Sequence, residues 1–128
     1  MSVSEHTFQS THKNGSHALY YSEWGAENAH LLICVHGLTG NGHDFDYLAP
    51  ELVKNGYRVI AIDLPGRGRS DFLDNPLDYN YSQYILDLEN LLAHLGYNKP
   101  QSVDWLGVSL GGLLGIRMAS DPDTPIKR

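Results

Sequence analysis

One serine in this 128-residue chain stands out because of the glycines on either side of it. The stretch WLGVSLGGLLG, residues 105–115, holds a single hydroxyl, Ser109, between Gly107 and Gly111. A core segment gains nothing from an isolated serine, whereas a serine in the pattern G-x-S-x-G can be a nucleophile. In that arrangement a strand turns sharply into a helix, the serine projects from the apex, and the glycines leave room for the turn. The serine then lies at a helix N-terminus, where free N–H groups favour developing negative charge.

The residues around this turn predict the strands and helices that would position it. Three apolar runs have the composition of strands buried on both faces of a sheet: 30–35, 57–63 and 102–107. Three segments place apolar residues at helical spacing and so predict helices: 45–56, 80–96 and 110–120. Pro50 lies inside the first helix, which must therefore start late or bend there. Asn80 and Gln83 have the spacing of a capping box at the start of the second helix.

The N-terminal segment has the pattern of a β-hairpin. Strands are expected over about 5–12 and 17–24, joined around Asn14-Gly15, because Asn-Gly supplies the positive φ angles of a tight turn. After the hairpin, strands and helices alternate, which predicts an α/β fold with a mostly parallel sheet and flanking helices. Three glycine-rich loops, HGLTGNGH, LPGRGRS and GVSLGG, follow the buried strands. They are expected to gather where the carboxyl ends of those strands meet.

Such loops can also cradle phosphate groups, and the first one contains side chains that could bind a metal. It has the glycine spacing of a P-loop, but His43-Asp44 stands where lysine and a hydroxyl residue are required. An N-cap role for Asp44 or Asp46 is expected rather than metal binding beside His36. We therefore expect no nucleotide, metal or other cofactor. The remaining histidines are expected at surface or hairpin positions: His6, His12, His17, His30 and His94.

Three segments resemble consecutive signature segments of the α/β-hydrolase fold superfamily: LLICVHGLTGNGHDF, VIAIDLPGRGRSD and VDWLGVSLGGLLG. The resemblance covers about residues 17 to 120 and implies that His36 and Gly37 shape an oxyanion loop. It also implies an oxyanion hole made by the backbone N–H groups of Leu38 and Leu110. Relatives that dehalogenate or open epoxides carry aspartate at the nucleophile position. The serine here therefore implies ester, amide or thioester chemistry through an acyl-enzyme.

A serine nucleophile needs a histidine base oriented by a carboxylate, and in α/β-hydrolases both follow the serine in the chain. The 19 residues after Ser109 contain no histidine. Asp121 and Asp123 follow a helix whose 1.5 Å rise per residue carries them roughly 18 Å away. His36, as the residue that shapes the oxyanion loop, is expected to point into the fold. Residues 1–128 are therefore interpreted as the N-terminal part of a single, incomplete α/β-hydrolase domain.

On this interpretation the triad acid, the histidine and the C-terminal strands are missing, so the chain alone is expected to be inactive. The outer side of the strand at 102–107 is expected to be an open row of unpaired backbone groups. Such an edge favours aggregation, a dimer formed through the edge strand, or a complementing C-terminal fragment.

The composition is that of a globular chain with one core, because 41% of the residues are hydrophobic. A formal net charge of −6 argues against nucleic acid or an anionic membrane surface as a partner. No signal peptide or membrane span is recognised, and Cys34 lies in an apolar run, so a cytoplasmic location is expected. The leading hypothesis is a carboxylesterase-like serine hydrolase with a small-molecule acyl substrate. The alternatives are an acyltransferase or aminopeptidase of the same fold, or an inactive remnant or binding module on a hydrolase scaffold.

Overall fold

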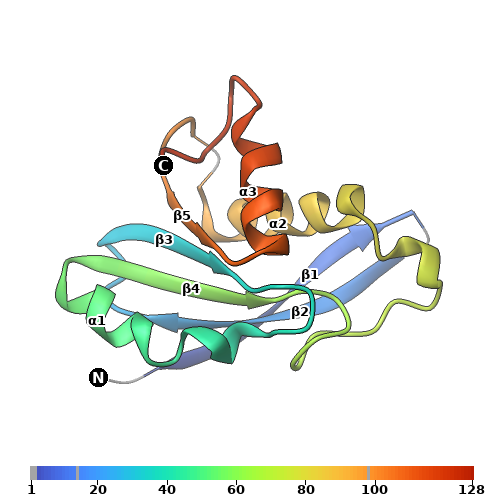
Figure 1. Cartoon of the computed structure of the whole chain (residues 1–128), viewed down its shortest axis with the longest axis horizontal. Coiled ribbons are helices and arrows are strands. Elements are labelled where there is room, and N and C mark those ends of the chain that lie inside the picture. The colour runs from blue at the N-terminus through green and yellow to red at the C-terminus, as the bar shows by residue number, and fades with distance from the viewer. Residues whose placement is uncertain (1–2, 14, 98) are drawn as a thin grey trace.

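The computed structural model describes residues 3–13, 15–97 and 99–128, which form an open five-stranded sheet with helices on both faces (Figure 1). The strands are β1 (Ser4–His12), β2 (Gly15–Trp24), β3 (His30–Val35), β4 (Tyr57–Asp63) and β5 (Asp104–Gly107). The helices are α1 (Leu48–Lys54), α2 (Tyr81–Leu95) and α3 (Leu110–Ala119). Two 3-10 turns precede the first two helices, η1 at Gly42–Phe45 and η2 at Pro76–Asp78.

The strands follow the order β1-β2-β4-β3-β5 across the sheet. β3 lies between β4 and β5 and is parallel to both, whereas the β1–β2 hairpin joins the sheet through an antiparallel pairing of β2 with β4. The α/β fold class is thus confirmed, with a mixed sheet whose parallel part is the one predicted. Because β3, β4 and β5 run the same way, the loops that follow them emerge at one edge (Figure 1).

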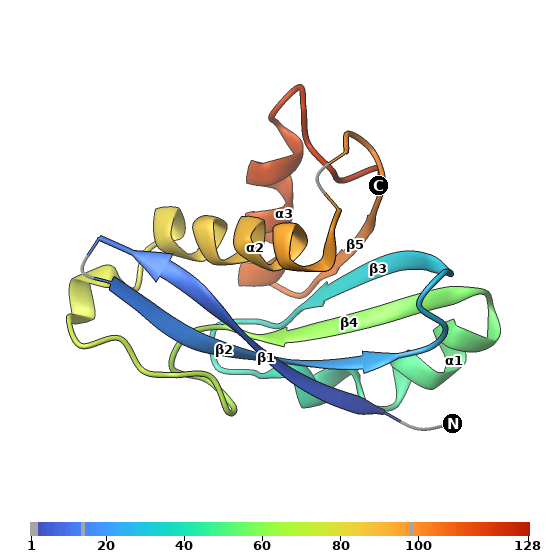
Figure 2. The same ribbon diagram turned by 180° about the vertical axis from the view of Figure 1, so that it is seen from behind.

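Different helices cover the two faces of the sheet, as the front and back views show (Figures 1 and 2). α2 and α3 pack over the larger core, whose fully buried members include Leu19, Ile33, Ile62, Leu88 and Leu114. α1 and η1 lie on the other face, over a smaller core that includes Trp24, Cys34, Phe45 and Val59. The continuous apolar runs of β3 and β4 follow from this burial on both sides. Burial also raises the pKa of the Cys34 thiol to about 12, which keeps it protonated and unreactive.

The helices begin and end where local chemistry permits. α1 starts late rather than bending, so Pro50 falls in its first turn, where a missing N–H breaks no helical hydrogen bond. At the start of α2 the Gln83 N–H donates to Asn80 Oδ1 over 2.9 Å, which is one arm of the expected capping box. The Gln83 side chain donates instead to the Thr11 carbonyl and to Asp87 Oδ1. None of the helices in the described ranges combines the length and apolar character that crossing a bilayer requires.

The hairpin and β5 differ from prediction at their ends. β2 begins at Gly15, whose φ is +140°, and Asn14 of the expected turn lies outside the described residues. β5 is shorter than the predicted strand, and its outer side is not fully open. Lys127 N–H donates to the Val103 carbonyl at 2.6 Å, and Trp105 N–H donates to the Arg128 carbonyl at 2.8 Å. The expectation of a fully unpaired edge is therefore wrong over Val103–Trp105.

Candidate active site

Ser109 lies at the turn between β5 and α3, in the N-cap position of the helix. Its φ of 52° and ψ of −111° are a backbone conformation that only glycine adopts without strain. The side chain is exposed and makes no capping hydrogen bond to α3. The hydroxyl therefore has no structural task that would account for a serine at this strained position.

The two glycines of the motif are required by close backbone approaches. A Cβ at Gly111 would collide with the Val35 carbonyl at the end of β3. A Cβ at Gly107 would collide with the backbone of Gly111 and Gly112 at the start of α3. The first turn of α3 is thus pressed against the carboxyl ends of β3 and β5, which fixes where Ser109 emerges.

The loop after β3 lies directly beside this turn. The Val108 N–H donates to the Val35 carbonyl at 3.0 Å, so the two strands remain joined up to the turn. A Cβ placed on Gly37 would lie 3.6 Å from Ser109 Cβ, within ordinary contact distance. The loop that begins at His36 therefore faces the serine, as the oxyanion-loop hypothesis requires.

His36 holds this loop and is fully buried. The Leu64 N–H donates to His36 Nε2 at 3.0 Å, so Nδ1 carries the proton and donates to the Gly37 carbonyl at 2.7 Å. Burial lowers the pKa of His36, which keeps the ring neutral in this tautomer. Because both ring nitrogens are engaged, His36 is not available as the base for Ser109, as expected from sequence.

The peptide between Gly37 and Leu38 is oriented from its carbonyl side. The Gly37 oxygen accepts hydrogen bonds from His36 Nδ1 and, at 3.0 Å, from the Gly40 N–H. In a planar trans peptide the N–H points opposite to the C=O, so the Leu38 N–H is directed away from these two donors. Leu110 is the first residue of α3. Its N–H, like the others in the first turn of a helix, has no acceptor within the helix. Convergence of the Leu38 and Leu110 N–H groups on one oxyanion position stays a prediction.

A buried carboxylate joins the first two glycine-rich loops. Asp63, the last residue of β4, accepts from the Gly42 N–H at 2.6 Å and from the Arg69 N–H at 3.1 Å. Gly68 passes so close to this carboxylate that any side chain there would collide with it. Asp63 was not predicted as a site residue, although its place at the end of a buried strand is the signal that could have identified it.

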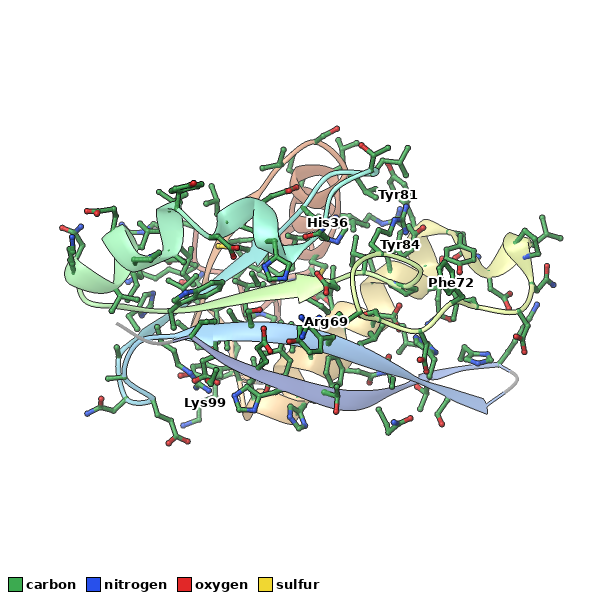
Figure 3. All side chains as sticks on the ribbon, turned by 90° about the horizontal axis from the view of Figure 1, so that it is seen from below. His36, Arg69, Phe72, Tyr81, Tyr84 and Lys99 are labelled. Atoms are coloured by element: carbon green, nitrogen blue, oxygen red, sulfur yellow. The ribbon has the colours of Figure 1, made fainter. Side chains whose placement is uncertain are left out.

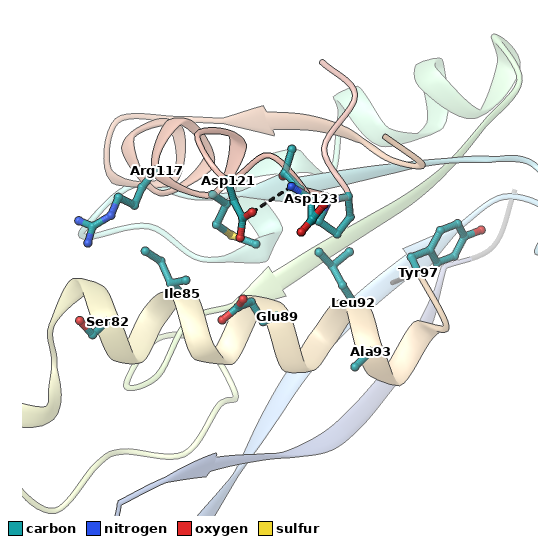
Figure 4. A pocket seen from close by; sticks show the side chains of 12 residues that line it. Ser82, Ile85, Glu89, Leu92, Ala93, Tyr97, Arg117, Asp121 and Asp123 are labelled. Atoms are coloured by element: carbon teal, nitrogen blue, oxygen red, sulfur yellow. Dashed lines mark hydrogen bonds between the residues drawn. The ribbon is translucent and has the colours of Figure 1, made fainter. Parts of the chain in front are cut away.

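No catalytic acid or base is placed at Ser109 within the described residues. Asp121 and Asp123 lie beyond the far end of α3, where Asp121 Oδ1 accepts from the Asp123 N–H (Figure 4). They border a groove of about 440 Å³ between α2 and α3, whose lining includes Ile85, Leu92 and Met118 but not Ser109. His43 pairs with Asp46 through Nδ1 at 3.0 Å, and no described group of three His, Cys, Asp or Glu residues could hold a metal ion.

A buried polar cluster near the turn of the hairpin was not expected from the sequence. Ser10 Oγ donates to Asp87 Oδ1 at 2.6 Å, and His17 Nε2 lies 2.8 Å from the same oxygen. All three side chains are buried, so His17 occupies a hairpin position, as expected, but does not lie on the surface. The polar residues Gln83, Asp87 and Asn90 recur at helical spacing on α2, and this stripe was the signal available in the sequence.

Comparison with known proteins identifies the family. A family model described as the alpha/beta hydrolase fold matches residues 30–128. The chain is 43% identical over 115 residues to a 3-hydroxybutyrate-oligomer hydrolase from Cupriavidus necator, covering 89% of this chain and 38% of that protein. It is 33% identical over 108 residues to a haloalkane dehalogenase from Psychrobacter cryohalolentis, covering 82% of this chain and 34% of that protein.

Solved structures agree with the sequence relatives. An alpha/beta hydrolase from Novosphingobium aromaticivorans superposes with a TM-score of 0.84 and 33% identity, covering 97% of this chain and 41% of that one. This chain therefore spans well under half the length of the proteins that it resembles. The match over most of the chain, together with the sheet order and the turn at Ser109, makes this chain a member of the α/β-hydrolase family.

Proposed function

We propose that Ser109 is the nucleophile of a serine hydrolase that cleaves esters or related acyl substrates through an acyl-enzyme. The observation that carries this proposal is the strained, exposed serine at the β5–α3 turn, which contributes nothing to the helix cap. Serine rather than aspartate at this position favours acyl transfer over dehalogenation or epoxide opening.

The chemistry follows from the surroundings of the hydroxyl. Ser109 Oγ attacks the acyl carbonyl carbon while its proton passes to a base, and the carbonyl oxygen becomes an oxyanion. The N–H groups of Leu38 and Leu110 would stabilise that oxyanion. The leaving alcohol takes the proton back from the base, and water then releases the acyl group by the same steps in reverse. The base and its carboxylate would come from polypeptide beyond the described residues, such as a complementing C-terminal portion.

The similarity to a 3-hydroxybutyrate-oligomer hydrolase suggests the substrate class. We propose short oligoesters of hydroxy acids, in which each bond joins a hydroxyl to a carboxyl group, as the substrates to examine first. An acyltransferase or aminopeptidase of the same fold would use the same serine. Matched p-nitrophenyl esters and p-nitroanilides distinguish these activities, because an esterase prefers the ester and an aminopeptidase cleaves the anilide.

The test is the formation of acyl-Ser109. The chain is incubated with p-nitrophenyl acetate, and intact-mass and peptide-mass measurements follow the added acetyl group. We expect slow, stoichiometric acetylation at Ser109 and none at this position in Ser109→Ala. Acetylation confined to lysines would contradict the proposal.

A second candidate, an inactive remnant or binding module, is favoured by the engagement of both His36 nitrogens, which leaves Ser109 without a base among the described residues. It predicts an ester that binds at the serine edge and remains intact. Line broadening of the ester's NMR signals without acetylation of Ser109 would support it.

A further inference from the structure

Arg67, in the loop after β4, contacts its own loop, the loop after β3 and helix α2. Arg67 Nε donates to the Leu38 carbonyl at 3.0 Å, and Nη1 donates to the Pro65 carbonyl at 2.9 Å. Nη1 also donates to the Tyr84 hydroxyl at 2.9 Å, and the guanidinium carbon lies 5.4 Å from the centre of the Tyr84 ring. We propose that Arg67 is a positioning residue that fixes the direction of the Leu38 N–H through the Leu38 carbonyl. This inference rests on the proposed function of Ser109.

Two peptide groups flank Leu38, and each is held through its carbonyl oxygen. The carbonyl of the first is held by His36 and the Gly40 N–H, as described above. The carbonyl of the second, that of Leu38 itself, is held by Arg67. When both peptide planes are fixed, the Leu38 backbone cannot rotate and its N–H keeps one direction.

The Leu38 side chain contributes little to this restraint, because the residue is 61% exposed. The loop is therefore positioned by hydrogen bonds to its backbone rather than by apolar packing. An oxyanion donor is effective when it is already aimed before the charge develops, so a loss of orientation lowers the rate even if the N–H remains. Arginine suits this task because its planar group carries several donors in fixed directions, which the single ammonium of lysine does not.

A second arginine of the same loop makes the same kind of contacts on the other side. Arg69 Nη1 donates to the Tyr20 hydroxyl at 2.9 Å, and its guanidinium carbon lies 5.2 Å from the Tyr20 ring centre. It also pairs with Glu5 at 3.2 Å, so it braces the hairpin and not the loop at Leu38. In Figure 3, Arg69 lies beside the hairpin strands, whereas His36 and Tyr84 lie away from those strands. Arg69 is therefore a matched control for Arg67.

The experiment compares Arg67→Gln, Arg67→Lys and Arg69→Gln with the unmodified chain. The rate of acyl-Ser109 formation is measured by intact mass over a range of p-nitrophenyl acetate concentrations. We expect Arg67→Gln to lower the maximal rate about tenfold without changing the half-saturating ester concentration, since only the donor's orientation is lost. Arg67→Lys should recover part of the rate, and Arg69→Gln should leave it within about twofold.

A second readout does not require acylation. The Leu38 amide signal in ¹H–¹⁵N NMR spectra should shift and its hydrogen exchange should accelerate in Arg67→Gln, with no such change in Arg69→Gln. Equal amide signals in the two variants would overturn the proposal, as would equal acylation rates. If the unmodified chain acetylates no Ser109 while the Leu38 amide still responds to Arg67→Gln, the function fails and the positioning role stands.

Discussion

Ser109 and Ser10 have opposite surroundings, and the difference shows what a catalytic serine requires. Ser10 is fully buried beside a carboxylate and a histidine, while Ser109 is exposed at a strained turn with neither. In the buried cluster the order is wrong for catalysis, because Ser10 donates its proton to Asp87 and not to His17. No substrate can reach it. Having the three residue types of a triad close together is therefore not sufficient, whereas exposure and the strained strand-to-helix turn make Ser109 the candidate.

The buried cluster is better interpreted as an anchor between the hairpin and α2. Asp87 Oδ1 accepts hydrogen bonds from Ser10 Oγ and, at 2.9 Å, from the Gln83 side chain. The same oxygen also pairs with His17. The other carboxylate oxygen, Oδ2, and His17 Nδ1 are buried without a partner among the described residues. Burying these polar groups costs desolvation energy, which their mutual hydrogen bonds and ion pairing offset. Removing one member therefore leaves the others buried without a partner.

The largest effect should separate the two serines by reactivity. A serine without its histidine loses on the order of 10⁶ in kcat in subtilisin, so turnover of p-nitrophenyl acetate by residues 1–128 alone should be undetectable against Ser109→Ala. The slower single acylation of Ser109 should persist in Ser10→Ala and disappear in Ser109→Ala. Ordinary enzymatic turnover that Ser109→Ala abolishes would show that a base is present after all.

The next effect concerns the anchor. Asp87→Ala removes the common acceptor and leaves His17 and Ser10 without a partner, so the free energy of unfolding should fall by about 4 kcal/mol. Urea denaturation followed by circular dichroism measures this change. The exposed neighbour Glu89→Ala is the control and should stay within about 0.5 kcal/mol of the unmodified chain. Equal losses in the two variants would mean that the cluster anchors nothing.

A smaller loss of stability is expected at the turn that carries Ser109. Gly111→Ala places a methyl group against the Val35 carbonyl oxygen, a backbone atom that cannot move aside. The free energy of unfolding should therefore fall by about 3 kcal/mol. Gly112→Ala is the matched control, since its nearest contact would be the Gly107 carbonyl oxygen at 3.3 Å. The same denaturation measurement compares the two. A tolerated Gly111→Ala would refute the close packing of α3 against β3.

The smallest effect is a difference in how stability depends on pH at His36, beside the serine turn, and at Asp87, in the buried cluster. Burial lowers the pKa of His36 below 6.5, so the folded chain binds fewer protons than the unfolded chain, and acidification below pH 6.5 should reduce stability. Burial raises the pKa of Asp87 above 3.8, despite its hydrogen bonds and His17, so acidification from that raised pKa toward 3.8 should add stability. Urea denaturation across this range should show the first slope lost in His36→Asn and the second in Asp87→Asn.

The sequence predicted the elements whose pattern is local and missed the contacts that join distant segments. The runs at 30–35 and 57–63 appear as β3 and β4 with the predicted bounds, because burial on both faces leaves an unbroken apolar signature. The predicted strand at 102–107 was too long by two residues, since only its last four residues have β3 beside them.

The site was predictable to a similar degree. The position of Ser109 at a strand-to-helix turn and the burial of His36 follow from short motifs, and the structure has both. The contacts that were missed join residues far apart in the sequence. Arg67 and Leu38 are 29 positions apart, and Ser10 and Asp87 are 77 positions apart. No local pattern encodes such pairings, so only the polar stripe on α2 and the charge in the loop hinted at them.

The backbone angles of Ser109 have a consequence for laboratory evolution. At a φ of 52° and a ψ of −111°, glycine relieves strain that serine must bear, so Ser109→Gly should raise the free energy of unfolding by about 1 kcal/mol. In a library of variants sorted only for resistance to proteolysis, position 109 should drift toward glycine. In a library sorted for labelling by an activated ester, serine should be retained. The divergence between the two populations at this one position would measure how far folding and reactivity make opposing demands on the chain.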